Sequence, residues 1–301
     1  MPTVAVNGIG IWYERSHGDG PALVLTHGFA GPTGGWPPVI EDLKRDFDLV
    51  LYDVRAHGRT GMPADPATVT MRQFAADLAG LIDALGLDRP HVGGVSMGGM
   101  ITAQFGCDFP GVARSLLLCD TLAGNMGGDD PDALAVERVV AGAFERTAAI
   151  VEKHGLEELV RREDRYTREH DRYAHLQIWT LDEQAERNRA RKAGMMTREG
   201  FIAAARAVRE REDLTSRLPD LTLPVLISCG EWDLFYPCAR RDAALIPNRR
   251  FVTIREAAHA TPDYQPGLWR QAVRDFIRDV EAGVDVRGDA VLSPPDGAPR
   301  T

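Results

Sequence analysis

The sequence predicts an α/β fold with a mostly parallel, eight-stranded sheet, helices on both faces and one helical insertion. Two observations predict this class. Short apolar runs alternate with longer segments whose apolar residues recur at helical spacing, as in strands joined by crossover helices. The stretch from 123 to 213 interrupts this alternation and contains no convincing strand. With 301 residues, the chain is long enough for one large core and such an insertion.

The predicted strands are short, and most are apolar throughout, as in strands buried on both faces of a parallel sheet. They are residues 4–6, 11–15, 22–26, 49–53, 90–93, 115–119, 225–229 and 251–254. The first two form a hairpin around Asn7-Gly8, a pair that tolerates positive φ in a tight turn. A helix begins after Thr70, a good N-cap residue, and ends before Gly86 with its apolar residues on one face.

The interruption determines the expected domain organisation. We expect a core in two parts, residues 1–122 and 214–282, around a helical cap, or lid, at 123–213. The cap is rich in charges, and such charge runs are typical of solvated helix faces. Its predicted helices are residues 134–154, 176–193 and 197–212. Residues 283–301 contain Pro, Gly and Asp with little apolar content, which predicts a flexible C-terminal tail.

Composition narrows the classes of partner. A formal net charge of -9 disfavours nucleic-acid binding, which needs a basic surface. The sequence contains no run of the roughly 20 apolar residues that a membrane span requires. Its amino terminus lacks the charged and apolar pattern of a signal peptide. We therefore expect a cytoplasmic protein without nucleic-acid or membrane partners, and no pattern predicts its oligomeric state.

Ser96 is the candidate nucleophile, because it lies between glycines in Gly94-Val95-Ser96-Met97-Gly98, at a predicted strand-to-helix turn. A serine hydroxyl is a weak nucleophile at neutral pH, so it must project from a sharp turn where a base can reach it. Small flanking residues leave room for that turn. The chemistry also needs an acid and a histidine, in the order Ser, Asp or Glu, His, each after its own strand.

Asp233 and His259 meet this requirement. Asp233 follows the predicted strand 225–229, and His259 follows the last predicted strand. Loops that follow parallel strands open on the carboxyl edge of the sheet, where open α/β folds bind ligands. We predict that Asp233 orients His259 and that His259 acts as the general base for Ser96.

Two backbone N–H groups are the candidate oxyanion hole. Phe29 lies in the glycine-bearing loop His27-Gly28-Phe29, directly after the strand 22–26. Met97 follows the nucleophile at the amino terminus of a helix. Both N–H groups are predicted to stabilise the negative charge that develops on a carbonyl oxygen under attack.

These stretches together resemble the α/β-hydrolase superfamily over nearly the whole core. Besides the residues above, the segment Asp53 to Arg59 matches, with Ala56 where the family commonly has glycine and Thr60 where it often has serine. The resemblance implies an α/β-hydrolase fold and a serine esterase or lactonase that forms an acyl-enzyme. A narrower similarity, in 96–100 and 211–215, is to 3-oxoadipate enol-lactone hydrolases and perhydrolase-like esterases.

Other residues compete for these roles. Asp120 also ends a predicted strand and is the alternative acid, whereas Glu231 is expected to face away from the site. His27 and His57 lie in turns and are expected to hold loops. The sequence has no H-E-x-x-H, no phosphate-binding glycine loop and no dinucleotide fingerprint, which predicts an enzyme without metal or cofactor.

The expected substrate is a small molecule, a carboxylic ester or lactone. Trp36, Trp232 and Trp179 are candidate pocket residues, the first two beside catalytic loops and the third in the cap. Hydrolysis of a carbon-carbon bond or an amide, and perhydrolysis, use the same triad and stay open. A function of a different class also stays open. The protein would then be a ligand receptor that keeps the fold, has vestigial hydrolase activity and uses the lid as a switch.

Overall fold

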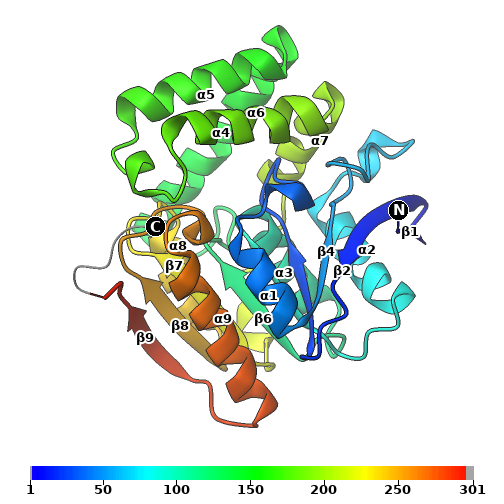
Figure 1. The fold of residues 1–301 in the computed structure, drawn as a ribbon, viewed down its shortest axis with the longest axis vertical. Helices are drawn as coiled ribbons and strands as arrows, with labels where there is room; N and C mark the ends of the chain where they lie inside the picture. Colours follow the sequence, from blue (N-terminus) through cyan, green and yellow to red (C-terminus); the bar gives the residue numbers. More distant parts are fainter. Residues whose placement is uncertain (1, 296–301) are drawn as a thin grey trace.

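The computed structural model describes residues 2–295. Within this range a single sheet has nine strands in the order β1-β2-β4-β3-β5-β6-β7-β8-β9 (Figure 1). β1 pairs with β2 and β2 with β4 in antiparallel register, and all pairs from β4 to β9 are parallel. The strands are β1 Thr3–Val6, β2 Ile9–Arg15, β3 Ala22–Thr26, β4 Asp48–Tyr52, β5 His91–Val95, β6 Ser115–Cys119, β7 Val225–Gly230, β8 Arg249–Ile254 and β9 Gly288–Leu292.

The mostly parallel α/β sheet is confirmed, but the predicted number of eight strands is wrong. The ninth strand, β9, comes from the segment expected to be a flexible tail, and it pairs in parallel with Arg250–Ile254 of β8. Most of β9 is exposed, so it lacks the apolar run by which buried strands are found in a sequence. Backbone hydrogen bonds to β8 hold it, and Asp289 pairs with Arg240 and Arg249. Residues 296–301 of the expected tail lie outside the described residues.

Helices cover both faces of the sheet, as predicted. α1 and α9 bury apolar side chains against one face, among them Leu43, Trp269 and Phe276. α2, α3 and α8 cover the other face, where Phe74 and Phe105 lie in the core. These helices are α1 Val39–Asp46, α2 Met71–Ala84, α3 Met97–Asp108, α8 Tyr236–Leu245 and α9 Pro266–Glu281. Among the described residues, none of the helices is both long and apolar enough to cross a membrane.

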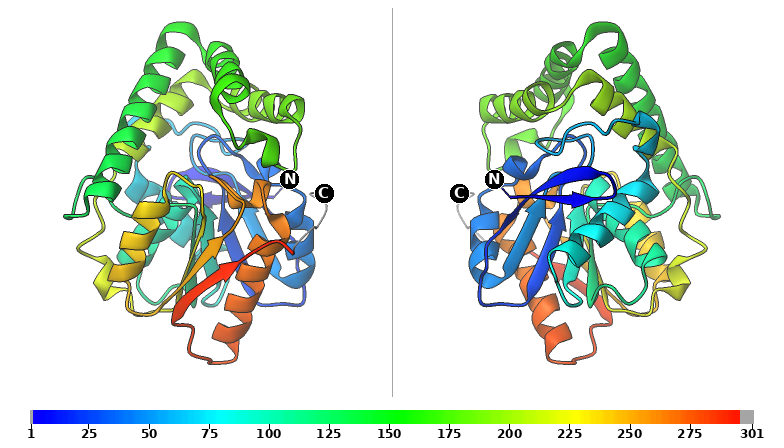
Figure 2. Two further views of the ribbon diagram at one scale, coloured as in Figure 1. Left: turned by 90° about the vertical axis from the view of Figure 1, so that its left-hand side faces the viewer. Right: turned by 90° about the vertical axis from the view of Figure 1, so that its right-hand side faces the viewer.

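Four more helices, the insertion helices, lie between β6 and β7 in the sequence. They are α4 Pro131–His154, α5 Leu156–His170, α6 Leu181–Met195 and α7 Arg198–Arg209. They lie together at one end of the molecule in all views (Figures 1 and 2). α4 packs against α5 and α7, and α5 packs against α6.

Two elements of the insertion differ from their prediction. α5 was not expected to be a helix, because its two buried apolar residues, Leu159 and Val160, lie among many charged ones. α6 begins at Leu181 instead of 176, because Thr180 and Glu183 form a capping box there.

Candidate active site

Ser96 lies at a strained turn between β5 and α3. Its backbone has φ 57° and ψ -119°, a region that residues other than glycine rarely adopt. A Cβ on Gly94 would overlap the backbone of Gly98, and a Cβ on Gly98 would overlap the backbone of Thr26. The turn is held because the hydroxyl of Thr121 donates to the carbonyl of Ser96 at 2.7 Å. The glycines are therefore needed for close packing around the serine.

The structure brings Ser96, His259 and Asp233 together in one chain of hydrogen bonds. His259 Nε2 lies 2.9 Å from Ser96 Oγ, and His259 Nδ1 lies 3.0 Å from each carboxylate oxygen of Asp233. The Asp233 side chain is fully buried and also accepts a hydrogen bond from the Phe235 N–H at 2.9 Å. The ring of Phe235 meets the His259 ring edge to face at 4.7 Å. The imidazole is thus fixed between a buried carboxylate and a hydroxyl.

The electrostatics favour a proton on His259. Desolvation by burial lowers the pKa of the imidazole, but the charge and hydrogen bond of Asp233 outweigh it and raise the pKa above its ordinary value of 6.5. The negative charge of Asp120 raises the pKa further. The site therefore stabilises the imidazolium form of His259.

Asp120, the alternative acid, lies behind this chain of hydrogen bonds. It accepts from the N–H and the hydroxyl of Thr261, at 2.7 and 2.5 Å, and from the N–H of Gly230 at 3.2 Å. Burial and the charge of Asp233 raise the pKa of Asp120 to about 7. Asp120 thus links the loops that carry Asp233 and His259, whereas Asp233 is the carboxylate that meets the imidazole.

One group of side chains within the described range has metal-ligand spacing. Asp120, Cys229 and Asp233 each offer a ligand atom within 4.8 Å of the others. The Asp233 oxygens already bind His259, and those of Asp120 bind Thr261 and Gly230. Burial raises the pKa of the Cys229 thiol well above 9.0, which disfavours the thiolate that a metal needs. These three side chains are therefore better suited to the hydrogen bonds that they make than to binding a metal ion.

The loop with Phe29 lies directly against Ser96. A Cβ on Gly28 would be 3.5 Å from Ser96 Cβ, which is van der Waals contact, so this loop borders the serine. Among the residues that the structure describes, neither the Phe29 N–H nor the Met97 N–H donates a hydrogen bond. Met97 is also the first residue of α3, where the helix dipole favours negative charge. Both predicted donors are free to bind an anionic oxygen.

The Phe29 side chain forms an aromatic cluster with the insertion. Its ring meets Phe144 of α4 at 4.8 Å and Phe201 of α7 at 4.9 Å, both edge to face. Phe144 and Phe201 were not predictable from the sequence, because apolar residues on an amphipathic helix have the same pattern whichever surface they cover.

His27, His57 and Glu231, the other candidates for catalytic roles, each contact backbone groups. His27 Nδ1 lies 2.7 Å from the Gly28 carbonyl, and its Nε2 accepts from the Val54 N–H at 3.0 Å. His57 is buried with Nδ1 3.0 Å from the Arg55 carbonyl, and burial lowers its pKa to about 3. Glu231 accepts from the N–H of Glu256. The contacts of His27 and His57 hold loops, which is the role expected of these two histidines.

Each of the three predicted pocket tryptophans has a packing partner. Trp36 stacks on Trp269 with ring centres 6.1 Å apart, and Trp232 stacks on Tyr173 at 4.7 Å. The indole N–H of Trp179 donates to Asp263, four residues after His259, at 3.0 Å. Trp179 therefore joins the insertion to the loop that carries His259.

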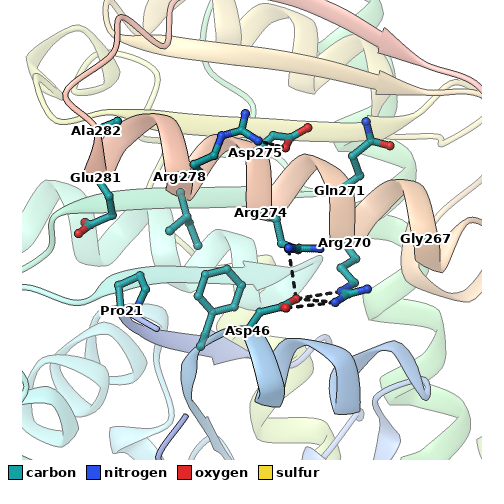
Figure 3. A pocket seen from close by; sticks show the side chains of 12 residues that line it. Pro21, Asp46, Gly267, Arg270, Gln271, Arg274, Asp275, Arg278, Glu281 and Ala282 are labelled. Atoms are coloured by element: carbon teal, nitrogen blue, oxygen red, sulfur yellow. Dashed lines mark hydrogen bonds and ion pairs between the residues drawn. The ribbon is translucent and has the colours of Figure 1, made fainter. Parts of the chain in front are cut away.

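A surface hollow of about 600 Å³ lies apart from these residues, between α1 and α9 (Figure 3). It is lined by Pro21 and Phe47, which directly precede β3 and β4, so it lies at the amino edge of the sheet. Asp46 there pairs with Arg270 at 2.9 Å and with Arg274 at 3.4 Å. Its lining as a whole has three acidic and three basic side chains, so it has no formal net charge, and it contains none of the predicted site residues.

Comparisons with known proteins agree with the fold. A family model described as the alpha/beta hydrolase fold matches residues 21–266. RutD of Azorhizobium caulinodans, to which carbamate hydrolysis is ascribed, is 27% identical over 271 residues, 89% of this chain and 96% of its own. The 3-oxoadipate enol-lactonase 1 of Acinetobacter baylyi is 24% identical over 269 residues, 87% and 90% of the two chains. A thermophilic esterase from Thermogutta terrifontis superposes with a TM-score of 0.72 and 29% identity, over 92% of this chain and 97% of the esterase.

Proposed function

The chain belongs to the alpha/beta hydrolase fold family, and on that premise we propose that it is a serine hydrolase of carboxylic esters or lactones. Membership of the family supports hydrolase activity in general. The hydrogen-bonded chain from Ser96 Oγ through His259 to the buried Asp233 carries the proposal. His259 Nε2 lies 2.9 Å from Ser96 Oγ, within the reach that proton transfer requires, and this distance supports the proposed roles of general base and nucleophile.

In the proposed mechanism, His259 Nε2 accepts the Ser96 proton while Oγ attacks the carbonyl carbon of the substrate. Asp233 keeps the remaining proton on Nδ1 and stabilises the imidazolium. The oxyanion of the tetrahedral intermediate accepts hydrogen bonds from the N–H groups of Phe29 and Met97. The imidazolium then protonates the leaving alkoxide, and an acyl-enzyme forms. A water molecule activated by His259 attacks the acyl group and releases the carboxylic acid.

We further propose that residues 123–213 act as the cap of this site. The insertion contacts the oxyanion loop through Phe29, Phe144 and Phe201. It contacts the histidine loop through Trp179 and through the N–H of Ile178, which donates to the Asp263 carbonyl at 2.9 Å. A substrate bound at Ser96 would therefore lie beneath these helices, whose side chains would select it.

Labelling with a fluorophosphonate tests the proposal, because the probe reacts only with an activated serine. We expect the wild type to be labelled and Ser96→Ala to remain unlabelled. Ser216→Ala, which removes an exposed serine, is the matched control and should be labelled like the wild type. An unlabelled wild type, or equal labelling of Ser96→Ala, would reject the serine mechanism and favour the ligand receptor.

A substrate panel tests the bond that is cleaved. It should contain aryl esters of increasing acyl length, several lactones, a carbamate and a substrate with an activated carbon-carbon bond. We expect the highest kcat/KM among the esters or lactones. A carbamate or a carbon-carbon substrate with a higher kcat/KM would contradict the assignment of the bond and leave the triad intact.

A further inference from the structure

Arg191 lies on α6, and residues 2–295 supply no partner for its charge. Among the described residues it makes no hydrogen bond and no ion pair, and its Nε atom is fully buried. Its neighbours on the helix differ, because Arg187 donates to the Gly35 carbonyl, Arg189 pairs with Glu157, and Lys192 pairs with Glu163. Arg191 is therefore a partly buried positive charge, and the described residues supply no negative charge that pairs with it.

The Arg191 side chain lies against the loop that also approaches the nucleophile. A Cβ on Gly35 would be 2.8 Å from Arg191 Cδ, so the arginine stem packs on the glycine. Gly35 belongs to the loop between β3 and α1 that carries the Phe29 N–H, and Gly28 of this loop contacts Ser96. Burial lowers the pKa of His27, and the positive charge of Arg191 lowers it further. The guanidinium thus acts electrostatically on the start of the oxyanion loop.

An anion beside the half-buried guanidinium of Arg191 would offset the cost of its partial removal from water. Removing a charge from water costs free energy that a partner of opposite charge must offset. The neighbouring cations make the cost larger, because the charge of Arg191 also lowers the pKa of Arg187 and of Lys192. The negative charge of Asp53 raises the pKa of the same His27. The carboxylate of Asp53 already accepts hydrogen bonds from the N–H groups of Thr33 and Arg59.

We propose that Arg191 binds a carboxylate of the substrate, so that the protein hydrolyses an ester or lactone of a dicarboxylic acid. The inference rests on the proposed serine hydrolase function and specifies its substrate class. A guanidinium offers two parallel N–H donors that match a carboxylate. One unpaired cation suits a monoanionic carboxylate better than a phosphate dianion, because Arg187 already donates to Gly35.

Two substrates of similar length test the inference by their KM values. Mono-para-nitrophenyl glutarate carries a free carboxylate, whereas para-nitrophenyl pentanoate carries a methyl group in its place. We expect Arg191→Met to raise KM for the glutarate ester by about 10- to 100-fold, the usual loss for a charge-assisted hydrogen bond, and to leave KM for pentanoate within about twofold. Arg191→Lys keeps the charge and should recover part of the loss.

Arg189→Met is the matched control, because Arg189 lies on the same helix, with its side chain 61% exposed and paired with Glu157. It should leave both KM values unchanged. If Arg191→Met changes neither KM, or raises both equally, Arg191 does not recognise a carboxylate, and the hydrolase assignment stands.

Titration calorimetry with free glutarate separates this inference from the function on which it rests. We expect the wild type to bind glutarate and Arg191→Met to bind it at least tenfold more weakly. Equal binding by the two proteins, or no binding to the wild type, would overturn the role of Arg191. If neither ester is cleaved and the fluorophosphonate does not react, the hydrolase function fails, and the titration still decides whether Arg191 binds a carboxylate.

Discussion

Replacing Asp233 by asparagine removes the charge that orients and stabilises His259 while nearly keeping the volume of the side chain. The carboxylate oxygens lie 3.0 Å from Nδ1, which places the two charges of the Asp233–imidazolium pair about 4 Å apart. At an effective dielectric constant near 20, unit charges at that separation interact by about 4 kcal/mol, or about three powers of ten in rate. Asparagine also favours the wrong imidazole tautomer. We expect kcat/KM to fall by about a thousandfold to ten-thousandfold.

Initial rates of para-nitrophenyl acetate hydrolysis measure this effect, and Asp120→Asn is the comparison. Asp120 is as deeply buried, but it bonds Thr261 and Gly230, and its raised pKa of about 7 leaves it partly neutral near physiological pH. We expect Asp120→Asn to reduce kcat/KM by about tenfold or less, through small movements of the loops. If Asp120→Asn reduces kcat/KM as much as Asp233→Asn does, the assignment of Asp233 as the acid of the triad is refuted.

Two other predictions concern pH and packing at the turn. His259 must be neutral to accept a proton, and Asp233 raises its pKa, so kcat/KM should fall as the pH decreases through a value above 6.5. This acidic limb should move to lower pH in Asp233→Asn, and an unmoved limb would assign it to another group. Gly94→Ala should lower the free energy of unfolding by about 1–3 kcal/mol, because the methyl group would overlap the Gly98 backbone. Gly34→Ala, whose Cβ would meet nothing within 4 Å, is the control in urea denaturation, and equal losses would contradict the packing argument.

The proposed triad was predictable because its signals are local. Ser96 lies between glycines, and Asp233 and His259 each follow an apolar strand, so turn chemistry and strand order were sufficient to name them. Parallel strands bring their carboxyl ends to one edge, and the structure places the three side chains in hydrogen-bonding contact there. The mostly parallel sheet with helices on both faces followed from the same alternation of patterns.

The ninth strand and the unpaired arginine were not predictable, because neither has a local signal. β9 is exposed and polar, and it is a strand only because its backbone meets the free edge of β8. Arg191 belongs to a charge run that predicts a solvated helix face, and only the packing of α6 against Gly35 directs it inward. Periodicity in a sequence specifies which residues share a face of a helix, whereas the contacts between distant segments decide what that face meets. The turn that presents Ser96, the proposed nucleophile, was therefore encoded locally, whereas the surroundings of this serine depend on tertiary packing.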